Sequence, residues 1–425
     1  MDRNSLYLLL SSQQNSFFSP QNLICREAVF KVVSLLKLRL PLIITGVRRC
    51  GKSSLMMLVR DELKLGKKEC LFVDFSDERL INFEHNDFQK IEDYLVENKY
   101  SENSFLFIDE VQEAKHWEKW VNRLKEKHSI IITGSNSKLL SKEIASTLTG
   151  RSVNLHLEPF SFKEFLTAKK INTENYLLDS KKQALIRRAF MEYHKNGGFP
   201  KMVLSEDETI LRELYDNILY RDVVARLGAN FEKPVKELSA YFLSNPSGKI
   251  SSRKAGGLMG ITNLLSVKKV LNAFENSFLF LFLPKFDFSI KKQIQNPRKL
   301  YCIDNGFLTA LGFRFSDNKG KMLENLVAVE LKRRSKDTYY FSDTKECDFV
   351  IKEGNKIVEA IQVTWRLTHE NRERETAGLI EAMDKFNLKK GTILTYDQKQ
   401  EITAQNKKIA IKPAWQWLLE NKKLY

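Results

Sequence analysis

Residues 46–53 read Gly46-Val47-Arg48-Arg49-Cys50-Gly51-Lys52-Ser53, which fits the pattern G-x-x-x-x-G-K-[ST]. The two fixed glycines let the backbone curl so that successive N–H groups point at phosphate oxygens. Lys52 can reach the β- and γ-phosphates of a nucleotide, and the hydroxyl of Ser53 can bind Mg²⁺. We therefore predict that this loop, continued by Ser54, binds ATP together with Mg²⁺.

The residues on both sides of the loop agree with that prediction. Residues 41–45 form a short apolar run typical of a buried strand, and residues 54–60 have the pattern of an amphipathic helix. The alternative is a glycine turn at an ordinary strand–helix junction. The strand–loop–helix order favours a phosphate-binding loop.

Two acidic residues follow a later apolar run. Residues 105–108 read Phe-Leu-Phe-Ile and lead directly into Asp109 and Glu110. At the end of a strand Asp109 can hold Mg²⁺ through water, and Glu110 can polarise the water that attacks the nucleotide. The alternative is a buried strand that ends in an acidic turn. Beside a phosphate-binding loop, the catalytic interpretation is favoured.

An apolar run at residues 70–75 is a second strand candidate, which makes the runs at 129–133 and 152–157 the fourth and fifth predicted strands; further site candidates follow the fourth and precede the fifth. Ser135 and Asn136 are candidates for sensing the γ-phosphate, and the alternative is a capping turn before a helix. Arg151 is a third catalytic candidate beside Lys52 and Glu110, because an arginine can stabilise charge on phosphate; its alternative is a surface ion pair. Strands that alternate with helices predict a parallel sheet covered on both faces.

The composition limits the class of protein. A chain of 425 residues suggests roughly two to four domains. Its net charge of +16 favours an acidic partner, of which nucleic acid is the usual one. Five scattered cysteines indicate neither a disulfide framework nor a zinc site, and they favour a cytoplasmic location. We find no signal peptide and no apolar run near the roughly 20 residues that cross a bilayer, so we expect no membrane partner.

Distinct short motifs are distributed along the whole chain. They are the phosphate-binding loop, Phe-Ile-Asp-Glu-Val-Gln at 107–112, Thr-Gly-Ser-Asn at 133–136, Leu-Thr-Gly-Arg at 148–151, Pro-Phe-Ser-Phe-Lys-Glu-Phe at 159–165, Gly-Gly-Phe-Pro at 197–200, Tyr-Arg-Asp-Val at 220–223, Lys-Leu-Tyr-Cys-Ile-Asp-Asn-Gly at 299–306, Glu-Cys-Asp-Phe at 346–349 and Ile-Gln-Val at 361–363. With these motifs the chain resembles an AAA-type family of prokaryotic ATPases. Members of that family join an ATPase module to a C-terminal domain of unknown function related to the PD-(D/E)xK restriction-endonuclease-like fold.

The resemblance and the residue patterns together imply a multidomain α/β protein in four parts. They are an AAA-type P-loop ATPase core at 1–158, a helical lid at 159–230, a winged-helix domain at 231–305 and a degenerate nuclease-like α/β domain at 306–425. Residues 159–228 show helical periodicity without strands, as a lid requires. Arg221, Asp222 and Arg226 are close enough on one helix to form ion pairs.

The predicted winged-helix domain at 231–305 is the basis for expecting DNA as a partner. A predicted helix at 266–275 turns Val267, Val270, Leu271 and Phe274 inward and leaves Lys268 and Lys269 outward, as a DNA-recognition helix requires. We expect a basic wing tip that consists of Lys291, Lys292, Arg298 and Lys299. Double-stranded DNA is therefore a candidate partner. The alternative is a domain that packs against its neighbours and uses its lysines for solubility.

The fourth part has a candidate metal site. In the restriction-like constellation an Asp and a Glu-x-Lys on the next strand share one face, where the acids bind Mg²⁺. The matching positions are Asp348, Gln362 and Thr364, with Glu324 on a preceding helix. Thr364 cannot supply the positive charge, although Lys352 or Lys356 could migrate into that role. We therefore expect Glu324, Asp348 and Gln362 to form a weakened metal site or an inert polar core.

Three functions remain open from the sequence. The first is an ATP-hydrolysing switch that couples nucleotide state to the later domains. The second is a Mg²⁺-dependent nuclease gated by the ATPase, and the third is a DNA-binding regulator that uses ATP only as a ligand. Self-association is a further possibility, because a catalytic arginine can act on a neighbouring subunit's nucleotide.

Overall fold

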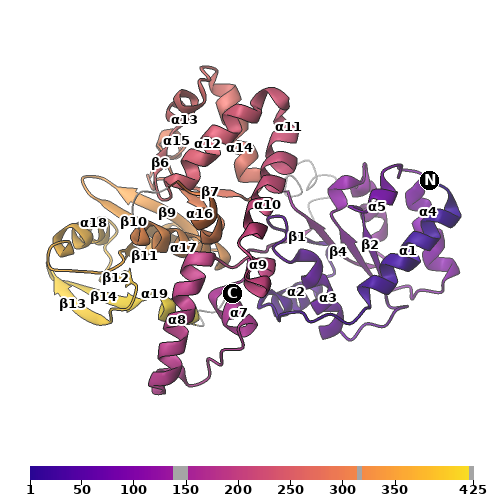
Figure 1. Cartoon of the computed structure of the whole chain (residues 1–425), viewed down its shortest axis with the longest axis horizontal. Coiled ribbons are helices and arrows are strands. Elements are labelled where there is room, and N and C mark those ends of the chain that lie inside the picture. The colour runs from indigo at the N-terminus through magenta and orange to yellow at the C-terminus, as the bar shows by residue number, and fades with distance from the viewer. Residues whose placement is uncertain (137–151, 314–317, 421–425) are drawn as a thin grey trace. The chain divides into compact units, whose positions relative to one another are not determined.

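The computed structural model describes residues 1–136, 152–313 and 318–420 (Figure 1). The chain divides into two compact units, Met1–Glu158 and Pro159–Tyr425, and each is described by itself. Among the described residues, no helix is long and apolar enough to cross a membrane.

The first unit contains a five-stranded parallel sheet, as predicted. Its strands are β1 (Leu42–Thr45), β2 (Cys70–Asp74), β3 (Phe105–Asp109), β4 (Ser129–Gly134) and β5 (Val153–His156), in the spatial order β2-β3-β4-β1-β5. All neighbouring strands run parallel. The carboxyl ends of β1, β3 and β4 therefore meet at one edge of the sheet, and the loop after β1 begins at that edge.

Helices cover this sheet: α1 (Arg3–Phe17), α2 (Ala28–Leu36), α3 (Lys52–Glu62), α4 (Asp87–Glu97) and α5 (Trp117–Leu124). α1, α4 and α5 share one apolar core with the sheet, and Trp117 and Trp120 on α5 lie in it. α1 also protects the edge strand β2. The side chain of Gln14 accepts from the Phe72 amide at 3.0 Å and donates to the Cys70 carbonyl at 2.7 Å, which satisfies backbone groups that an edge leaves open.

The second unit begins with helices: α7 (Phe162–Ala168), α8 (Ser180–Asn196), α9 (Pro200–Ser205), α10 (Thr209–Asn217), the π-helical segment η5 (Ile218–Val224) and α11 (Ala225–Leu227). As predicted, the structure contains no strand over residues 159–228. Within the predicted ion-pair set, Arg226 lies 3.8 Å from the buried Asp222.

A three-stranded antiparallel sheet follows, with the order β6 (Lys249–Ile250), β8 (Arg298–Cys302) and β7 (Phe280–Leu283). The helices around it are α12 (Glu232–Ser244), α13 (Ser252–Met259), α14 (Leu264–Asn276) and α15 (Ile290–Gln295). On α14 the four predicted apolar residues are buried, and Lys268 and Lys269 are exposed. The predicted basic tip is wrong for Lys299, which is only 2% exposed because its ammonium group is paired with carboxylates inside the unit.

The chain ends in a mixed six-stranded sheet with the order β13-β14-β12-β11-β10-β9. The strands are β9 (Asp337–Ser342), β10 (Glu346–Glu353), β11 (Lys356–Val363), β12 (Lys390–Thr395), β13 (Gln400–Ala404) and β14 (Lys407–Pro413). The helices are α16 (Asn305–Leu311), α17 (Lys319–Arg333), α18 (Arg372–Lys385) and α19 (Ala414–Leu419). The hairpin β13–β14 was not predicted. Its residues are mostly polar and only partly buried, so they lack the apolar run that indicated the other strands.

Two of the sequence motifs meet around Asp304. The Asp304 carboxylate accepts from the amides of Gly198 at 2.7 Å and Gly306 at 2.8 Å. Gly197 has φ +75°, and a Cβ there would lie 1.6 Å from Asp304 Oδ1. Burial raises the pKa of Asp304 to about 7, although both amides and Arg333 lower it. Gly197 is therefore a glycine because the backbone must approach this buried carboxyl group closely.

Candidate functional site

The loop after β1 has the backbone conformation that phosphate binding needs. Gly51 has φ +101° and Arg49 has φ +62°, so two peptides turn through the left-handed region just before α3 begins at Lys52. A Cβ at Gly46 would lie 2.2 Å from the Leu157 carbonyl oxygen, so this position also requires glycine. The turn brings the loop's amides to the amino end of a helix, where negative charge is favoured.

Lys52 and Glu110 form a buried ion pair beside this loop. Lys52 Nζ lies 3.3 Å from Glu110 Oε1 and donates to the carbonyls of Gly46 at 3.2 Å and Val47 at 3.4 Å. Burial raises the pKa of Glu110, but the ammonium of Lys52, the hydrogen bond from Gln112 and the charge of Arg48 act together with smaller contributions to lower it, so the net pKa lies below its ordinary value. Glu110 is therefore ionised at neutral pH, and it has the left-handed φ of +44° that positions its side chain at the loop.

Asp109 lies next to Glu110 in a different environment. Its carboxylate accepts from the hydroxyls of Thr133 and Ser53 and from the Glu110 amide at 3.2 Å. Burial, followed by the charge of Glu110, raises the pKa of Asp109 to about 6. Ser53 and Asp109 thus place two oxygen ligands side by side. Mg²⁺ in nucleotide sites takes one or two carboxylates and completes its shell with phosphates and water, so these residues fit Mg²⁺.

The two predicted sensor residues also lie at this edge. The Ser135 amide donates to Glu110 Oε2 at 3.2 Å. Ser135 and Asn136 are 1% and 4% exposed, and within the described residues the Ser135 hydroxyl is buried without a hydrogen-bond partner. A buried hydroxyl without a partner is costly, and a ligand can satisfy it. Arg151, the remaining catalytic candidate, lies outside the described residues.

Arg26 supports the loop, and sequence reasoning missed it. The side chain is buried and donates to the Cys50 carbonyl at 2.8 Å and the Glu158 carbonyl at 2.7 Å. It therefore ties the phosphate-binding loop to the segment after β5. A lone arginine carries no sequence signal of this role, because its partners are backbone carbonyls 24 and 132 residues away.

Replacing Arg26 with Met should weaken ATP binding without touching a nucleotide-contacting group. The change removes two charge-assisted hydrogen bonds, so we expect Kd for ATP to rise by about 10- to 100-fold. Isothermal titration with a non-hydrolysable ATP analogue measures this. Lys37→Met is the matched control, since Lys37 is exposed at the end of α2. An unchanged Kd in Arg26→Met would contradict the positioning role.

The side chain of Cys50 is buried beneath the loop. It is 0% exposed, and its sulfur is 2.9 Å from the position that a Cβ on Gly46 would take. Burial raises the pKa of the thiol, although Lys52 and Arg26 lower it. Cys50 is therefore a small side chain packed into the interior of the loop.

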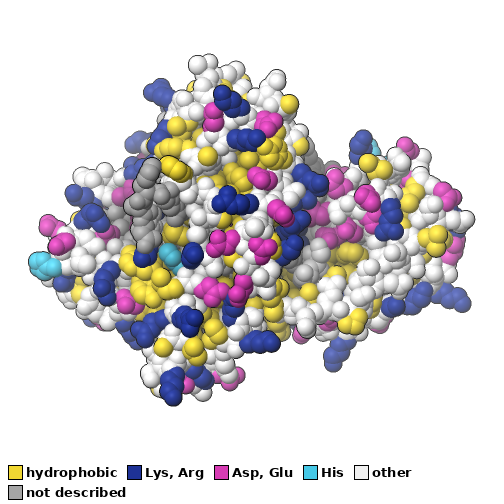
Figure 2. All heavy atoms as spheres, viewed as in Figure 1, with side chains coloured by type: hydrophobic (Ala, Val, Ile, Leu, Met, Phe, Trp, Pro, Cys, Tyr) yellow, Lys and Arg dark blue, Asp and Glu magenta, His cyan; other side chains and the backbone are white. Residues whose placement is uncertain are grey.

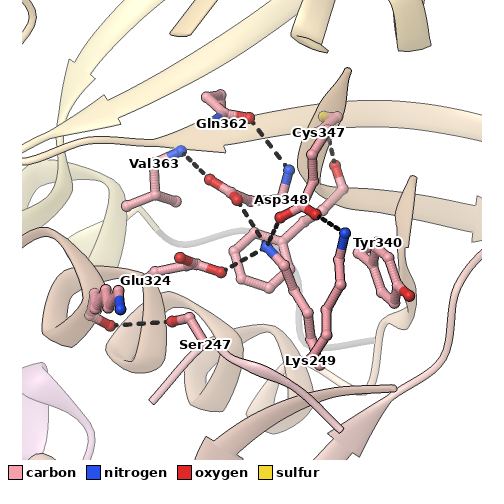
Figure 3. Close-up of polar contacts among 12 residues, drawn as sticks. Ser247, Lys249, Glu324, Tyr340, Cys347, Asp348, Gln362 and Val363 are labelled. Carbon is pink, nitrogen blue, oxygen red and sulfur yellow. Dashed lines mark hydrogen bonds and ion pairs between the residues drawn. The ribbon is translucent and has the colours of Figure 1, made fainter. Parts of the chain in front are cut away.

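In the second unit, the three candidate metal ligands come together (Figure 3). Asp348 Oδ2 accepts from the Val363 amide at 2.9 Å, and Gln362 Oε1 accepts from the Asp348 amide at 3.2 Å. Gln362 Nε2 donates to Glu375 on α18 at 3.1 Å. Glu324 and Asp348 both accept from Lys299 Nζ, at 2.9 and 2.8 Å. Across the described parts of the chain, no group of three or more His, Cys, Asp or Glu is arranged to hold a metal ion.

Lys352 and Lys356, the two lysines considered as substitutes for the missing charge, do not reach this site. Lys352 donates to Asp337 at 3.2 Å, and Lys356 is exposed. Lys352 lies near the end of β10 and Lys356 begins β11, so both lie at the turn of this hairpin. Lys299 on β8 supplies the positive charge instead. No pattern within residues 306–425 could have indicated it, because it belongs to a different sheet.

Comparison with known proteins matches three segments of the chain. Residues 39–166 match an AAA domain, residues 187–319 a domain of unknown function (DUF8612) and residues 319–417 another (DUF4143). The uncharacterized protein MJ1544 of Methanocaldococcus jannaschii is 36% identical over 400 residues, which cover 89% of this chain and 88% of MJ1544. The chain belongs to the MJ1544 family. A Haemophilus influenzae relative is 31% identical over 391 residues, covering 87% of this chain and 92% of that protein.

Two solved structures show only a distant similarity to the chain. The Walker-type ATPase PABY2304 of Pyrococcus abyssi has 14% identity and a TM-score of 0.40, covering 69% of this chain and 98% of that one. AMPPCP-bound DnaA from Aquifex aeolicus has 15% identity and a TM-score of 0.27, covering 60% and 90%. Scores this low add nothing about function. The family's AAA domain identifies the chain as an AAA-type ATPase, and binding of ATP with Mg²⁺ is the general property of that domain.

Proposed function

We propose that this protein binds and hydrolyses ATP and uses the nucleotide state of its AAA domain to control its second unit. The observation that carries the proposal is the convergence of Lys52, Asp109, Glu110 and the buried Ser135 hydroxyl on one phosphate-binding loop. These groups come from the carboxyl ends of β1, β3 and β4, the edge where open α/β sheets bind ligands.

Each residue has a distinct role in the proposal. Lys52 leaves Glu110 and pairs with phosphate when ATP enters, because phosphate carries more negative charge than one carboxylate. The Glu110 carboxylate is then free to take a proton from the attacking water. Ser53 and Asp109 would hold Mg²⁺, which neutralises charge on the phosphates when bound. Ser135 and Asn136 would contact the γ-phosphate, and Arg151 is proposed to stabilise the charge that develops there.

The finer domain assignments belong to the same proposal. We interpret residues 159–230 as a lid, 231–305 as a winged-helix domain and 306–425 as a nuclease-like domain. Support for the winged helix comes from the order of α12, α13 and α14 with the antiparallel sheet β6-β8-β7. Self-association would allow Arg151 to act on a neighbouring subunit, and we place the protein in the cytoplasm.

Lys52→Met tests the nucleotide site. The variant should lose ATP binding by about 100-fold or more, because it removes the charge that pairs with the phosphates. Equilibrium binding of a fluorescent ATP analogue, with phosphate release at saturating ATP, measures both steps. Lys64→Met is a control, since Lys64 is exposed just after α3. Equal ATP affinity in wild type and Lys52→Met would refute the site.

DNA is the second candidate partner, and one observation favours it. Lys268 and Lys269 are exposed side by side on α14, whose opposite face is buried. Figure 2 shows Lys and Arg side chains scattered among acidic and apolar ones over the visible face, so the basic helix rather than a broad basic surface supports the idea.

A mobility shift with double-stranded DNA tests the α14 contact. Binding should weaken steeply as salt rises, and Lys268→Glu with Lys269→Glu should abolish it at low salt. Lys389→Glu with Lys390→Glu is the matched charge reversal, because both lysines are exposed and lie outside the candidate DNA-binding domain. Equal loss in both double variants would indicate general electrostatics rather than recognition by α14.

A further inference from the structure

The carboxylates that resemble a nuclease metal site already bind a cation. Lys299 Nζ lies 2.8 Å from Asp348 Oδ1, 2.9 Å from Glu324 Oε1 and 2.8 Å from Glu346 Oε1. Three carboxylates therefore surround one ammonium group. The arrangement uses the acids of α17 and β10 for a side chain that comes from β8.

Lys299 belongs to a different sheet from Glu346 and Asp348, and a second lysine of that sheet also contacts the acids. Lys249 on β6 and Lys299 on β8 are register partners in the three-stranded sheet. Lys249 Nζ lies 2.5 Å from Glu346 Oε2, so Glu346 links both lysines. Figure 3 shows Lys249 reaching toward the acids from below while Glu324 and Asp348 approach from the other sides. Two lysines of the three-stranded sheet therefore pair with acids on α17 and β10.

Neighbouring contacts hold β8 in this position. Tyr301 donates to Glu324 Oε1 at 2.7 Å, and the Asn325 side chain pairs with both backbone groups of Cys302, at 2.7 and 2.9 Å. The Tyr340 hydroxyl on β9 donates to the Pro297 carbonyl at 2.6 Å. Lys299 is therefore one of several polar contacts that join β8 to the C-terminal domain.

The site is closed to a phosphodiester substrate. The side chains of Lys299, Asp348 and Glu324 are 2%, 8% and 11% exposed. Both Asp348 oxygens and Glu324 Oε1 accept hydrogen bonds from the protein, and so does the Gln362 amide oxygen. Burial, followed by the charge of Asp348, raises the pKa of Glu324 to about 7, which eases the excess of negative charge. A catalytic metal and its substrate would have to displace these contacts.

We propose that the Glu324, Glu346 and Asp348 carboxylates form an internal receptor for the Lys299 ammonium, which takes the cation position and fastens β8 to the C-terminal domain. The domain then binds no divalent ion at this place while Lys299 is seated. This inference is independent of ATP hydrolysis, since it concerns residues of the second unit alone.

Terbium binding to the full-length protein tests the receptor. Tb³⁺ is a hard cation that takes carboxylate ligands, and its emission is sensitised by a nearby tyrosine such as Tyr301. We expect Lys299→Ala to gain a several-fold increase in tyrosine-sensitised emission over wild type. Adding Asp348→Asn to that variant should abolish the gain, which excludes terbium bound elsewhere. Lys292→Ala, exposed on α15, should match wild type.

Two outcomes would overturn the proposal. One is an Asp348-dependent terbium signal in wild type equal to that of Lys299→Ala, since the seated lysine should exclude the ion. The other is a folded Lys299→Ala protein with no gain. Should that variant fail to fold, wild type against Asp348→Asn still decides, with Mn²⁺ binding measured by titration calorimetry. If Lys299 occupies the cation position, wild type and Asp348→Asn should bind Mn²⁺ equally. If the site is that of a metal nuclease, Asp348→Asn should bind less Mn²⁺ than wild type.

Discussion

Glu110→Gln should lower the rate of ATP hydrolysis by about 10²- to 10⁴-fold, the usual contribution of a positioned general base. The amide keeps the size and the hydrogen bonds from the Ser135 amide and Gln112 but cannot take a proton. The variant also loses the ion pair with Lys52 that ATP has to break. ATP affinity should therefore stay equal or increase while turnover collapses.

Steady-state phosphate release and equilibrium binding of ATP separate these two effects. Glu113→Gln is the matched control, because Glu113 is exposed three residues further along the chain. Its rate should stay within about twofold of wild type, as expected for a surface change away from the site. If Glu110→Gln hydrolyses ATP as fast as wild type, Glu110 is not the general base.

Gly197→Ala should destabilise the second unit by at least about 3 kcal/mol. Its φ of +75° and ψ of −163° fall in a region that only glycine adopts readily, and a Cβ would lie 1.6 Å from Asp304 Oδ1. The carboxyl group would have to move and would lose its hydrogen bonds from the Gly198 and Gly306 amides. At about 2 °C per kcal/mol for a domain of this size, Tm should fall by at least about 6 °C.

Differential scanning calorimetry measures this shift, and Gly257→Ala provides the control. Gly257 lies within α13, and a Cβ there would meet nothing within 4 Å. Alanine in place of a helical glycine should leave stability unchanged or raise it by ~0.5–1 kcal/mol. A similar small effect in Gly197→Ala would mean that the Asp304 contact yields easily and does not hold the two motifs together.

The phosphate-binding loop could be predicted because its chemistry is local. Eight consecutive residues supply the turn, the lysine and the hydroxyl, and the flanking strand and helix follow from periodicity of side chains over a few residues. The five strands of the first unit were apparent for the same reason, as each is a short apolar run. The hairpin β13–β14 was missed because it has no such run.

The sequence alone determined the class of the first unit, the position of its nucleotide loop and the acidic pair Asp109-Glu110. Only the tertiary structure decided which cationic side chains pair with these acids and with the acids of the second unit. Arg26 reaches the loop from 24 residues away, and Lys299 reaches Asp348 across 49 residues. Periodicity placed Lys299 on an exposed tip because a lysine usually pays a large desolvation cost when buried. Three carboxylates offset that cost here, and their meeting depends on how two sheets pack.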